Sequence, residues 1–158
     1  MKVRIFTDGA CSENPGPGGW AVVFNTDSRV YTMSGNEQLT TNNRMELRAV
    51  IEALKKIINK KNHKPDVEYE IYSDSAYVVN TINRNWYEAW QVNGWKTTKG
   101  DEVKNKDLWE EYLNLYYASL RLRVKITINK IKGHAGNTFN ELVDKLAKEE
   151  SMKAKVNE

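Results

Sequence analysis

The sequence predicts a single α/β domain, built on a five-stranded mixed sheet with an antiparallel meander first, parallel strands after it, and helices on its faces. Two observations predict it. Segments of strand-like alternation come first as a block of three and then alternate with segments of helical periodicity. A chain of 158 residues also suits one hydrophobic core. We place the domain at residues 1–150 and expect the polar tail, 151–158, to fray.

The first half of the chain predicts a meander followed by a long helix. Residues 2–8 alternate and form a strand that ends at Asp8. Prolines and glycines predict a tight turn at 13–19, and two further strands are expected at 20–25 and 29–34. The clearest helix follows, with an N-cap at Asn42 or Asn43 and one apolar stripe made by Leu47, Val50, Ile51, Leu54, Ile57 and Ile58.

The second half alternates strands and helices. A fourth strand, marked by Val67, Tyr69 and Ile71, ends at Asp74 and is followed by a short helix. A helix over 108–116, a strand over 122–128 and a helix over 139–146 complete the order. Because strands and helices alternate here, we expect the later strands to pair in parallel.

Several protein classes are excluded by composition. No apolar run is long enough to span a membrane, and the N-terminus lacks the apolar segment of a signal peptide. The single cysteine, Cys11, excludes an internal disulfide, suits a reducing cytosol and is expected to be inert, so we expect a cytoplasmic protein. Only His63 and His134 could join it at a zinc ion, too few for a usual set. A net charge of +3 neither requires nor excludes nucleic acid.

Four acidic residues lie in four separate, chemically dense stretches: Asp8, Glu46, Asp74 and Asp144. If the fold gathers them, their charges repel, by about 4 kcal/mol for a pair 4 Å apart at an effective dielectric near 20. Such a pocket takes up protons or hard cations, and Mg²⁺ is the usual occupant beside substrate phosphates. This set predicts a metal-dependent enzyme that acts on phosphates.

Each acid alone also has a structural interpretation. Asp8 fits a turn, Asp74 can cap the helix that follows it, and Glu46 fits a capping box because it lies three residues after Asn43. Asp144 lies off the apolar stripe of its helix and fits an exposed carboxylate. These interpretations do not explain why the four occur together.

Other residues are candidates for substrate contact or proton transfer. His134, between small residues in a loop, can move protons near neutral pH, or it is simply a surface histidine. Thr41, Asn42 and Asn43 offer a hydroxyl and amides at a helix N-terminus, where phosphate binds well. The tryptophan-rich segment that begins at Trp86 suits stacking on sugars or bases. Core packing is the alternative there, and it fits Trp90 and Trp109 better than Trp86.

The motifs together resemble one family. The stretches are TDGACSENPGPGGW, TTNNRMELRAVIEAL, YSDSAYV, NGWKT, VKNKDLW and KGHAGNTFNELVDKLA. Their order and spacing make the chain similar to ribonuclease H of type 1, the bacterial ribonuclease HI kind, up to about residue 150. The resemblance implies a ribonuclease H-like fold and an endonuclease that hydrolyses the RNA strand of RNA–DNA hybrids, leaving 5′-phosphate and 3′-hydroxyl ends.

The resemblance also implies roles for particular residues. Two Mg²⁺ ions, which Mn²⁺ can replace, would be held by Asp8, Glu46, Asp74 and Asp144, and His134 would be the mobile-loop histidine. The expected substrate contacts are to the minor groove and 2′-hydroxyls, to a phosphate of the DNA strand and to a deoxyribose, and they fall on Asn14, Thr41, Asn42, Asn43 and Trp86. We expect an RNA–DNA hybrid as the binding partner of a monomer, with no obligate protein partner and no membrane.

Three departures from the family pattern bear on affinity. Ala76 stands where a glutamine is common, the segment from Trp86 to Trp95 contains Glu88 instead of a strongly basic run, and the stretch after the long helix is longer. We therefore expect weaker hybrid binding, with every metal ligand kept. The open alternatives are a nuclease of the same fold with another nucleic-acid substrate, a non-catalytic hybrid-binding module, and a domain excised from a reverse transcriptase.

Overall fold

A computed structural model describes residues 1–60, 63–131 and 138–156. It contains one five-stranded sheet in the order β3-β2-β1-β4-β5. The strands are β1 (Lys2–Cys11), β2 (Gly16–Asn25), β3 (Val30–Thr40), β4 (Glu68–Ser73) and β5 (Lys125–Lys130). The first three strands pair antiparallel, whereas β4 pairs parallel with both β1 and β5. The predicted fold class is therefore confirmed.

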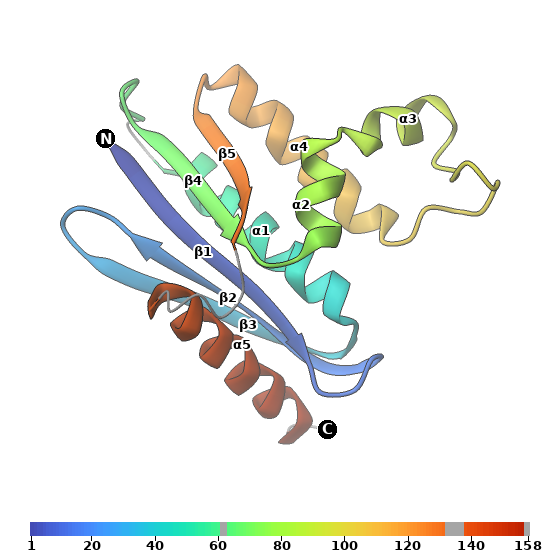
Figure 1. Cartoon of the computed structure of the whole chain (residues 1–158), viewed down its shortest axis with the longest axis horizontal. Coiled ribbons are helices and arrows are strands. Elements are labelled where there is room, and N and C mark those ends of the chain that lie inside the picture. The colour runs from blue at the N-terminus through green and yellow to red at the C-terminus, as the bar shows by residue number, and fades with distance from the viewer. Residues whose placement is uncertain (61–62, 132–137, 157–158) are drawn as a thin grey trace.

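Helices cover both faces of the sheet (Figure 1). The helices α1 (Asn42–Ile58) and α4 (Lys106–Arg121) lie on one face, and α5 (Thr138–Val156) lies on the other. The short helices α2 (Ala76–Asn83) and α3 (Trp86–Val92) lie beside β5 and α4. This arrangement leaves the lower ends of β1 and β4 in Figure 1 between α1 and α5.

The two cores follow from the alternation along β1. Val3 and Ile5 point to the face of α1 and α4 and join the larger hydrophobic cluster. Phe6 points to the opposite face and packs with Val143 and Ala147 of α5 in a smaller cluster. Because successive side chains of a strand point to opposite faces, a single strand is held from both sides.

The strand ends differ from the sequence prediction. β1 continues past Asp8 to Cys11, and β2 begins at Gly16, inside the expected turn. The reason is the antiparallel ladder, which pairs Asp8 with Ala21 and continues to Cys11 opposite Gly18. Backbone pairing with a neighbour therefore outweighs the local preference of proline and glycine for a turn. β5 also begins later than expected, at Lys125.

The helix caps differ as well. Thr41 is the N-cap of α1, and its hydroxyl accepts a hydrogen bond from the Arg44 amide. Ser75, rather than Asp74, caps α2 by accepting from the Val78 amide. The cap interpretations of Asp74 and of Asn42 or Asn43 are therefore wrong, and so is the capping box of Glu46 with Asn43.

The predicted frayed tail is wrong over residues 151–156, which continue helix α5. Ser151 and Ala154 are buried, and the Ser151 hydroxyl donates to the Pro17 carbonyl over 3.1 Å. The residues that this helix end buries are small or polar, so the sequence carries no hydrophobic stripe to mark it. Residues 157–158 lie outside the described part of the chain.

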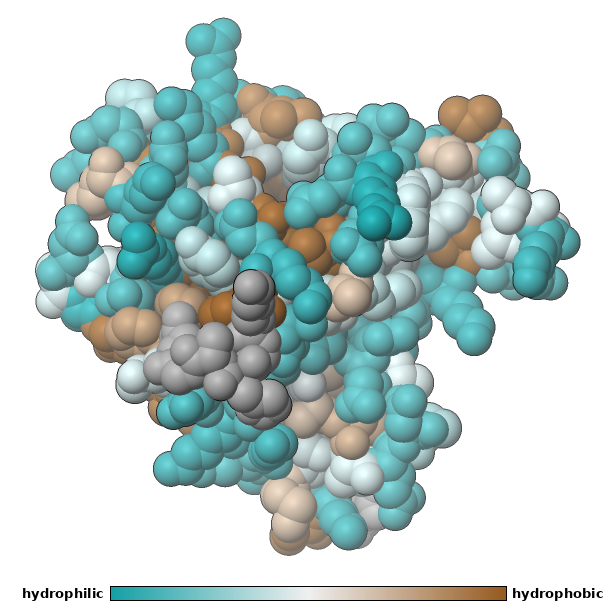
Figure 2. All heavy atoms as spheres, in the orientation of Figure 1, coloured by the Kyte–Doolittle hydropathy of each residue, from teal (hydrophilic) through white to brown (hydrophobic). Residues whose placement is uncertain are grey.

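The surface in Figure 2 is mostly hydrophilic, and its hydrophobic side chains form separate small groups. No helix within the described ranges combines the length and hydrophobicity that crossing a membrane requires.

We expect Gly19→Ala to destabilise the protein, because a methyl group there would overlap Ala147, Glu150 and Ser151 of α5. Overpacking of this kind costs about 1–3 kcal/mol of unfolding free energy. Urea unfolding measures it. Glu149→Ala, on the exposed side of the same helix, serves as the control and should change stability by less than about 0.5 kcal/mol. Equal stabilities for the two variants would contradict this packing.

Candidate active site

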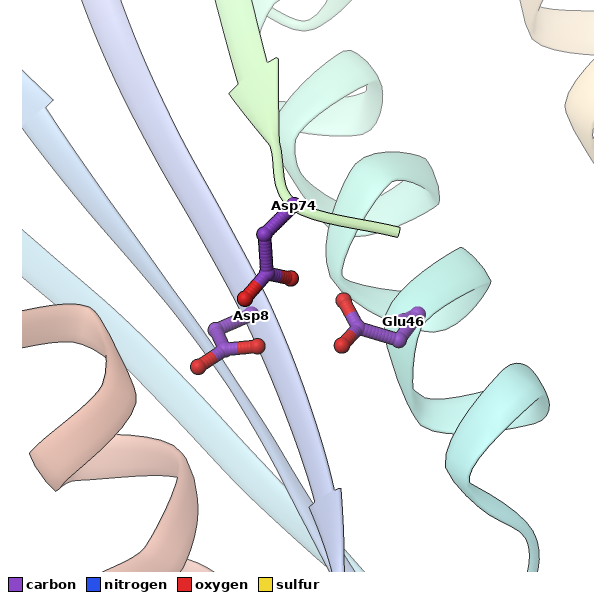
Figure 3. A group of neighbouring side chains, drawn as sticks. All are labelled: Asp8, Glu46 and Asp74. Atoms are coloured by element: carbon purple, nitrogen blue, oxygen red, sulfur yellow. The ribbon is translucent and has the colours of Figure 1, made fainter. Parts of the chain in front are cut away.

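Three carboxylates from three different elements meet at one point of the fold. Asp8 lies on β1, Glu46 lies near the start of α1, and Asp74 follows the end of β4. One oxygen of each lies within 4.8 Å of the other two. Figure 3 shows the three side chains pointing toward one another. The structure therefore gathers three of the four acids that the sequence singled out.

The sheet explains why Asp8 and Asp74 meet. The parallel ladder between β1 and β4 ends at the pair Phe6 and Tyr72. Asp8 and Asp74 each lie two residues beyond that pair, so they occupy equivalent positions at the edge where the parallel pairing of the two strands ends. This edge is where α/β sheets place their ligand sites. The sequence prediction of an acid at the end of β4 is confirmed, whereas Asp8 lies inside β1 and only its parallel pairing has ended.

Gly9 explains why Glu46 reaches the same point. A Cβ atom at Gly9 would overlap the backbone of Met45 and Glu46, so helix α1 rests directly on β1 there. The close approach brings the Glu46 carboxylate beside Asp8.

The environment of these carboxylates favours their protonated forms. Asp8 is only 4% exposed. Burial first, and then the charge of Asp74, raise its pKa from 3.8 to about 7. Burial, followed by the charges of Asp8 and Asp74, raises the pKa of Glu46 well above its ordinary value. Without a cation, the site therefore holds protons at neutral pH.

The donor set fits a hard divalent cation. Within the described residues, Oε2 of Glu46 is buried and has no hydrogen-bond partner. A buried oxygen left without a partner is costly, and a bound ion would satisfy it. All three donors are carboxylate oxygens, which Mg²⁺ and Mn²⁺ prefer over nitrogen or sulfur. The residues present therefore fit Mg²⁺.

Asp144 lies next to this group but is not one of the three clustered carboxylates. Its side chain on α5 is 42% exposed, and Oδ2 lies 3.0 Å from Nζ of Lys148. It also interacts with Asp8 and adds to the rise in the pKa of that residue. Lys148 was not among the predicted site residues, although its spacing of four residues from Asp144 on a helix is the pattern of an ion pair.

A cavity of about 690 Å³ surrounds the carboxylates. Its lining includes all four acids, together with Asn42, Asn43, Ser12 and Lys148. A somewhat larger cavity, about 770 Å³, lies between β5 and α4 and is rich in tyrosine. That second cavity brings no group of acids together within the described residues, so the first is the candidate active site.

The expected substrate residues fall into two groups. Asn42 and Asn43 line the cavity at the N-terminus of α1, and the side-chain oxygen of Asn14 accepts from the Asn42 amide over 3.1 Å. Thr41 caps that helix. Trp86 lies apart from them at the start of α3, 42% exposed.

Two of the tryptophans lie in or against the core, and Trp86 does not. Trp109 is fully buried and Trp90 packs against the core, as the core-packing interpretation required. The ring of Trp86 has the Arg84 guanidinium 5.8 Å from its centre. His134 lies outside the described residues.

Comparison with known proteins identifies the family. The RNase H family model matches residues 1–152. A ribonuclease H of Acetivibrio thermocellus is 47% identical over 152 residues, which cover 96% of this chain and 96% of that protein. A ribonuclease H of Caldicellulosiruptor saccharolyticus is 45% identical over 148 residues, or 93% and 94% of the two chains. The chain therefore belongs to the ribonuclease H family, as the resemblance indicated.

Solved structures give the same fold. LC9-RNase H1, described as a type 1 RNase H with the type 2 active-site motif, matches with a TM-score of 0.77 at 29% identity over 97% of this chain and 73% of its own. LC11-RNase H1, solved in complex with an RNA/DNA hybrid, matches with a TM-score of 0.69 at 24% identity over 96% and 98% of the two chains. Hydrolysis of the RNA strand of RNA–DNA hybrids is the function of the family, and the chain is a hydrolase of this kind.

We expect the contribution of Asp8 to the stability of the protein in EDTA to decrease as pH rises from about 4 to about 7. The folded state keeps a proton on Asp8 in this range, because its pKa is raised from 3.8 to about 7, whereas the unfolded state releases it. Removing the charge by Asp8→Asn should therefore raise the unfolding free energy at pH 8 by as much as about 4 kcal/mol and at pH 4 by much less. Urea unfolding at a series of pH values measures both.

The control for this prediction is Asp27→Asn, in the exposed turn between β2 and β3. It removes one negative charge far from the site and should leave the pH profile unchanged. An Asp8→Asn protein that is less stable than the unmodified chain at pH 8 would contradict the conclusion that a charged Asp8 destabilises the fold.

Proposed function

We propose that the protein is an endonuclease that hydrolyses the RNA strand of RNA–DNA hybrids by two-metal-ion catalysis, leaving 5′-phosphate and 3′-hydroxyl ends. The observation that carries the proposal is the group of Asp8, Glu46 and Asp74, the first buried and the others half-buried, in which one buried Glu46 oxygen lacks a hydrogen-bond partner among the described residues. Two Mg²⁺ ions, which Mn²⁺ can replace, are the proposed cofactors, with Asp144 as the fourth ligand.

The protein's part in this chemistry is to hold concentrated negative charge in a fixed place. When bound, two such ions would activate an attacking water and stabilise the leaving oxygen. Cation binding must displace the protons that the raised pKa values of Asp8 and Glu46 retain, so affinity should increase with pH. Asp144 is more exposed, and its ion pair with Lys148 through Oδ2 would compete with a cation for this carboxylate.

Recognition of the hybrid is proposed to use the polar edge of the cavity. Asn14, Asn42 and Asn43 are exposed, and amides both donate to and accept from a 2′-hydroxyl. The N-terminus of α1, with Thr41 and Asn42, suits a phosphate of the DNA strand. The complex of LC11-RNase H1 with a hybrid supports the substrate class for this fold.

Trp86 is proposed to pack against a deoxyribose, because its exposed ring lies on α3 away from the carboxylates. His134 is proposed to shuttle protons, on the family resemblance alone. All four proposed ligands come from one chain, so we propose that the protein acts as a monomer without a protein partner. Its proposed location is the cytoplasm, which its single cysteine suits.

We expect Asp8→Asn to lower Mg²⁺-dependent cleavage by at least about a thousandfold, since metal ions supply several kcal/mol of transition-state stabilisation. The assay uses end-labelled hybrid, double-stranded RNA, double-stranded DNA and single strands, each with Mg²⁺, Mn²⁺ or EDTA. The hybrid alone should be cut, and only with a divalent ion. Asp27→Asn is the matched control and should cleave normally.

Other outcomes of this assay point to other functions. Cleavage of duplex DNA at a similar rate would indicate a nuclease with a different substrate. Hybrid binding without cleavage in either metal would indicate a binding module. Normal cleavage by Asp8→Asn would disprove the metal assignment.

We expect Glu88→Lys to tighten hybrid binding, because the exposed Glu88 lies on α3 close to Trp86. If the new lysine contacts one phosphate, the slope of log K against log salt steepens by about 0.7–0.9. Fluorescence anisotropy with a catalytically inactive Asp8→Asn background measures it. Asp27→Lys makes the same charge change in a distant turn, and an equal gain for both variants would argue against contact through α3.

A further inference from the structure

Glu150 is a buried carboxylate that the proposed chemistry does not use. It lies on α5 and is only 7% exposed. Oε1 accepts from the Ser34 hydroxyl over 3.1 Å and from Nζ of Lys153 over 3.0 Å, and Oε2 accepts from the Asn36 amide over 2.7 Å. Burial alone would raise the pKa of Glu150, but the hydrogen bonds from Asn36, Lys153 and Ser34 outweigh it and hold the pKa below its usual range.

These hydrogen bonds tie α5 to the sheet. Ser34 and Asn36 lie on β3, in the ladder opposite Ala21 and Gly19 of β2. Burying a charge is expensive unless several donors satisfy it, so a carboxylate here holds its donors in a defined arrangement. Glu150 thus joins α5 to β3, whereas the apolar packing of the helix is against β1 and β2.

The apolar contacts of α5 do less than these hydrogen bonds to fix where the helix lies along the strands. Val143 and Ala147 bury apolar surface against Phe6, Ala21 and Val23, and apolar burial is not directional. The missing side chain at Gly19 lets the helix approach closely without choosing a register. The hydrogen bonds of Glu150 and the bond between Ser151 and Pro17 are directional contacts.

The position of α5 matters because the helix carries Asp144. Glu150 follows Asp144 by six residues, a rise of about 9 Å along the helix axis. The described ion pair of Asp144 is with Lys148 of the same helix, so it cannot hold Asp144 relative to Asp8. The placement of Asp144 at the site therefore depends on how the whole helix is seated.

We propose that Glu150 is a positioning residue for metal binding: by anchoring α5 to Ser34 and Asn36 of β3, it holds Asp144 where it can share a cation with Asp8. The inference rests on the proposed function, in which Asp144 is a metal ligand. Glu150 does not line the cavity. Its effect on cation affinity would act through the position of Asp144.

The test measures Mn²⁺ binding to the substrate-free protein by titration calorimetry, so that activity is not the readout. Glu150→Ala should weaken binding about tenfold, the lower end for residues that hold metal ligands in place. Glu150→Gln keeps the shape and the bond with Asn36, and it should bind nearly as well as the unmodified protein. Leu113→Val, in the core on the opposite face, controls for a general loss of stability.

A double-mutant cycle with Asp144→Asn separates a positioning role from a structural one. If Glu150 acts through Asp144, adding Glu150→Ala to Asp144→Asn weakens Mn²⁺ binding no further. A full additional loss in that background would overturn the inference, as would a Glu150→Ala affinity equal to that of the Leu113→Val control.

The same cycle distinguishes failure of the inference from failure of the proposed function. If Asp144→Asn binds Mn²⁺ normally, Asp144 is not a ligand, and the assignment and the inference both fail. If Asp144→Asn binds weakly while Glu150→Ala binds normally, only the inference fails. Should Glu150→Ala not fold, Asn36→Ala removes the shortest of its hydrogen bonds and should give the same weakening.

Discussion

The cost of charging three neighbouring carboxylates, set first by burial and then by their mutual repulsion, is what the rest of this structure must overcome. Asp8, Glu46 and Asp74 lie close together, Asp8 buried and the other two half-buried, and the raised pKa values of Asp8 and Glu46 indicate that the fold opposes their charges. Apolar packing on both faces of the sheet supplies the opposing free energy. Bound protons or cations therefore lower the electrostatic cost of the site. Because a cation binds the folded state, its affinity and the stability of the fold both depend on this cost.

The central strand explains how such an arrangement stays rigid. β1 pairs antiparallel with β2 and parallel with β4. Beyond Phe6 the parallel pairing has ended, while the antiparallel ladder continues through Asp8 and Ala21. Asp8 is thus free of backbone pairing on the side of Asp74, while its pairing with β2 still holds it in place. A ligand held on a paired strand is fixed more closely than one on a loop.

The sequence predicted what local periodicity and clustered motifs can express. The order of elements followed from alternation and helical stripes, and the acidic set followed from four dense motifs. The errors at the two ends of the domain have one physical cause, which is contact with a distant part of the chain. The end of β1 depends on β2, and the helix beyond Ser151 depends on a bond to Pro17. The role of Gly9 as a seat for α1 was equally invisible, because only the folded chain brings Glu46 against it.

The charge of the site also orders the events of binding. A nucleic acid brings its own negative phosphates, and Asp8, Glu46, Asp74 and Asp144 all line the cavity that must receive them. Without cations the two sets of charges repel, so substrate and metal should each increase the affinity for the other. The exposed amides of Asn42 and Asn43 and the positive end of α1 lie on the same cavity. They offer the phosphates a place beside the acids, so contact with the substrate can begin before the cations have neutralised the centre.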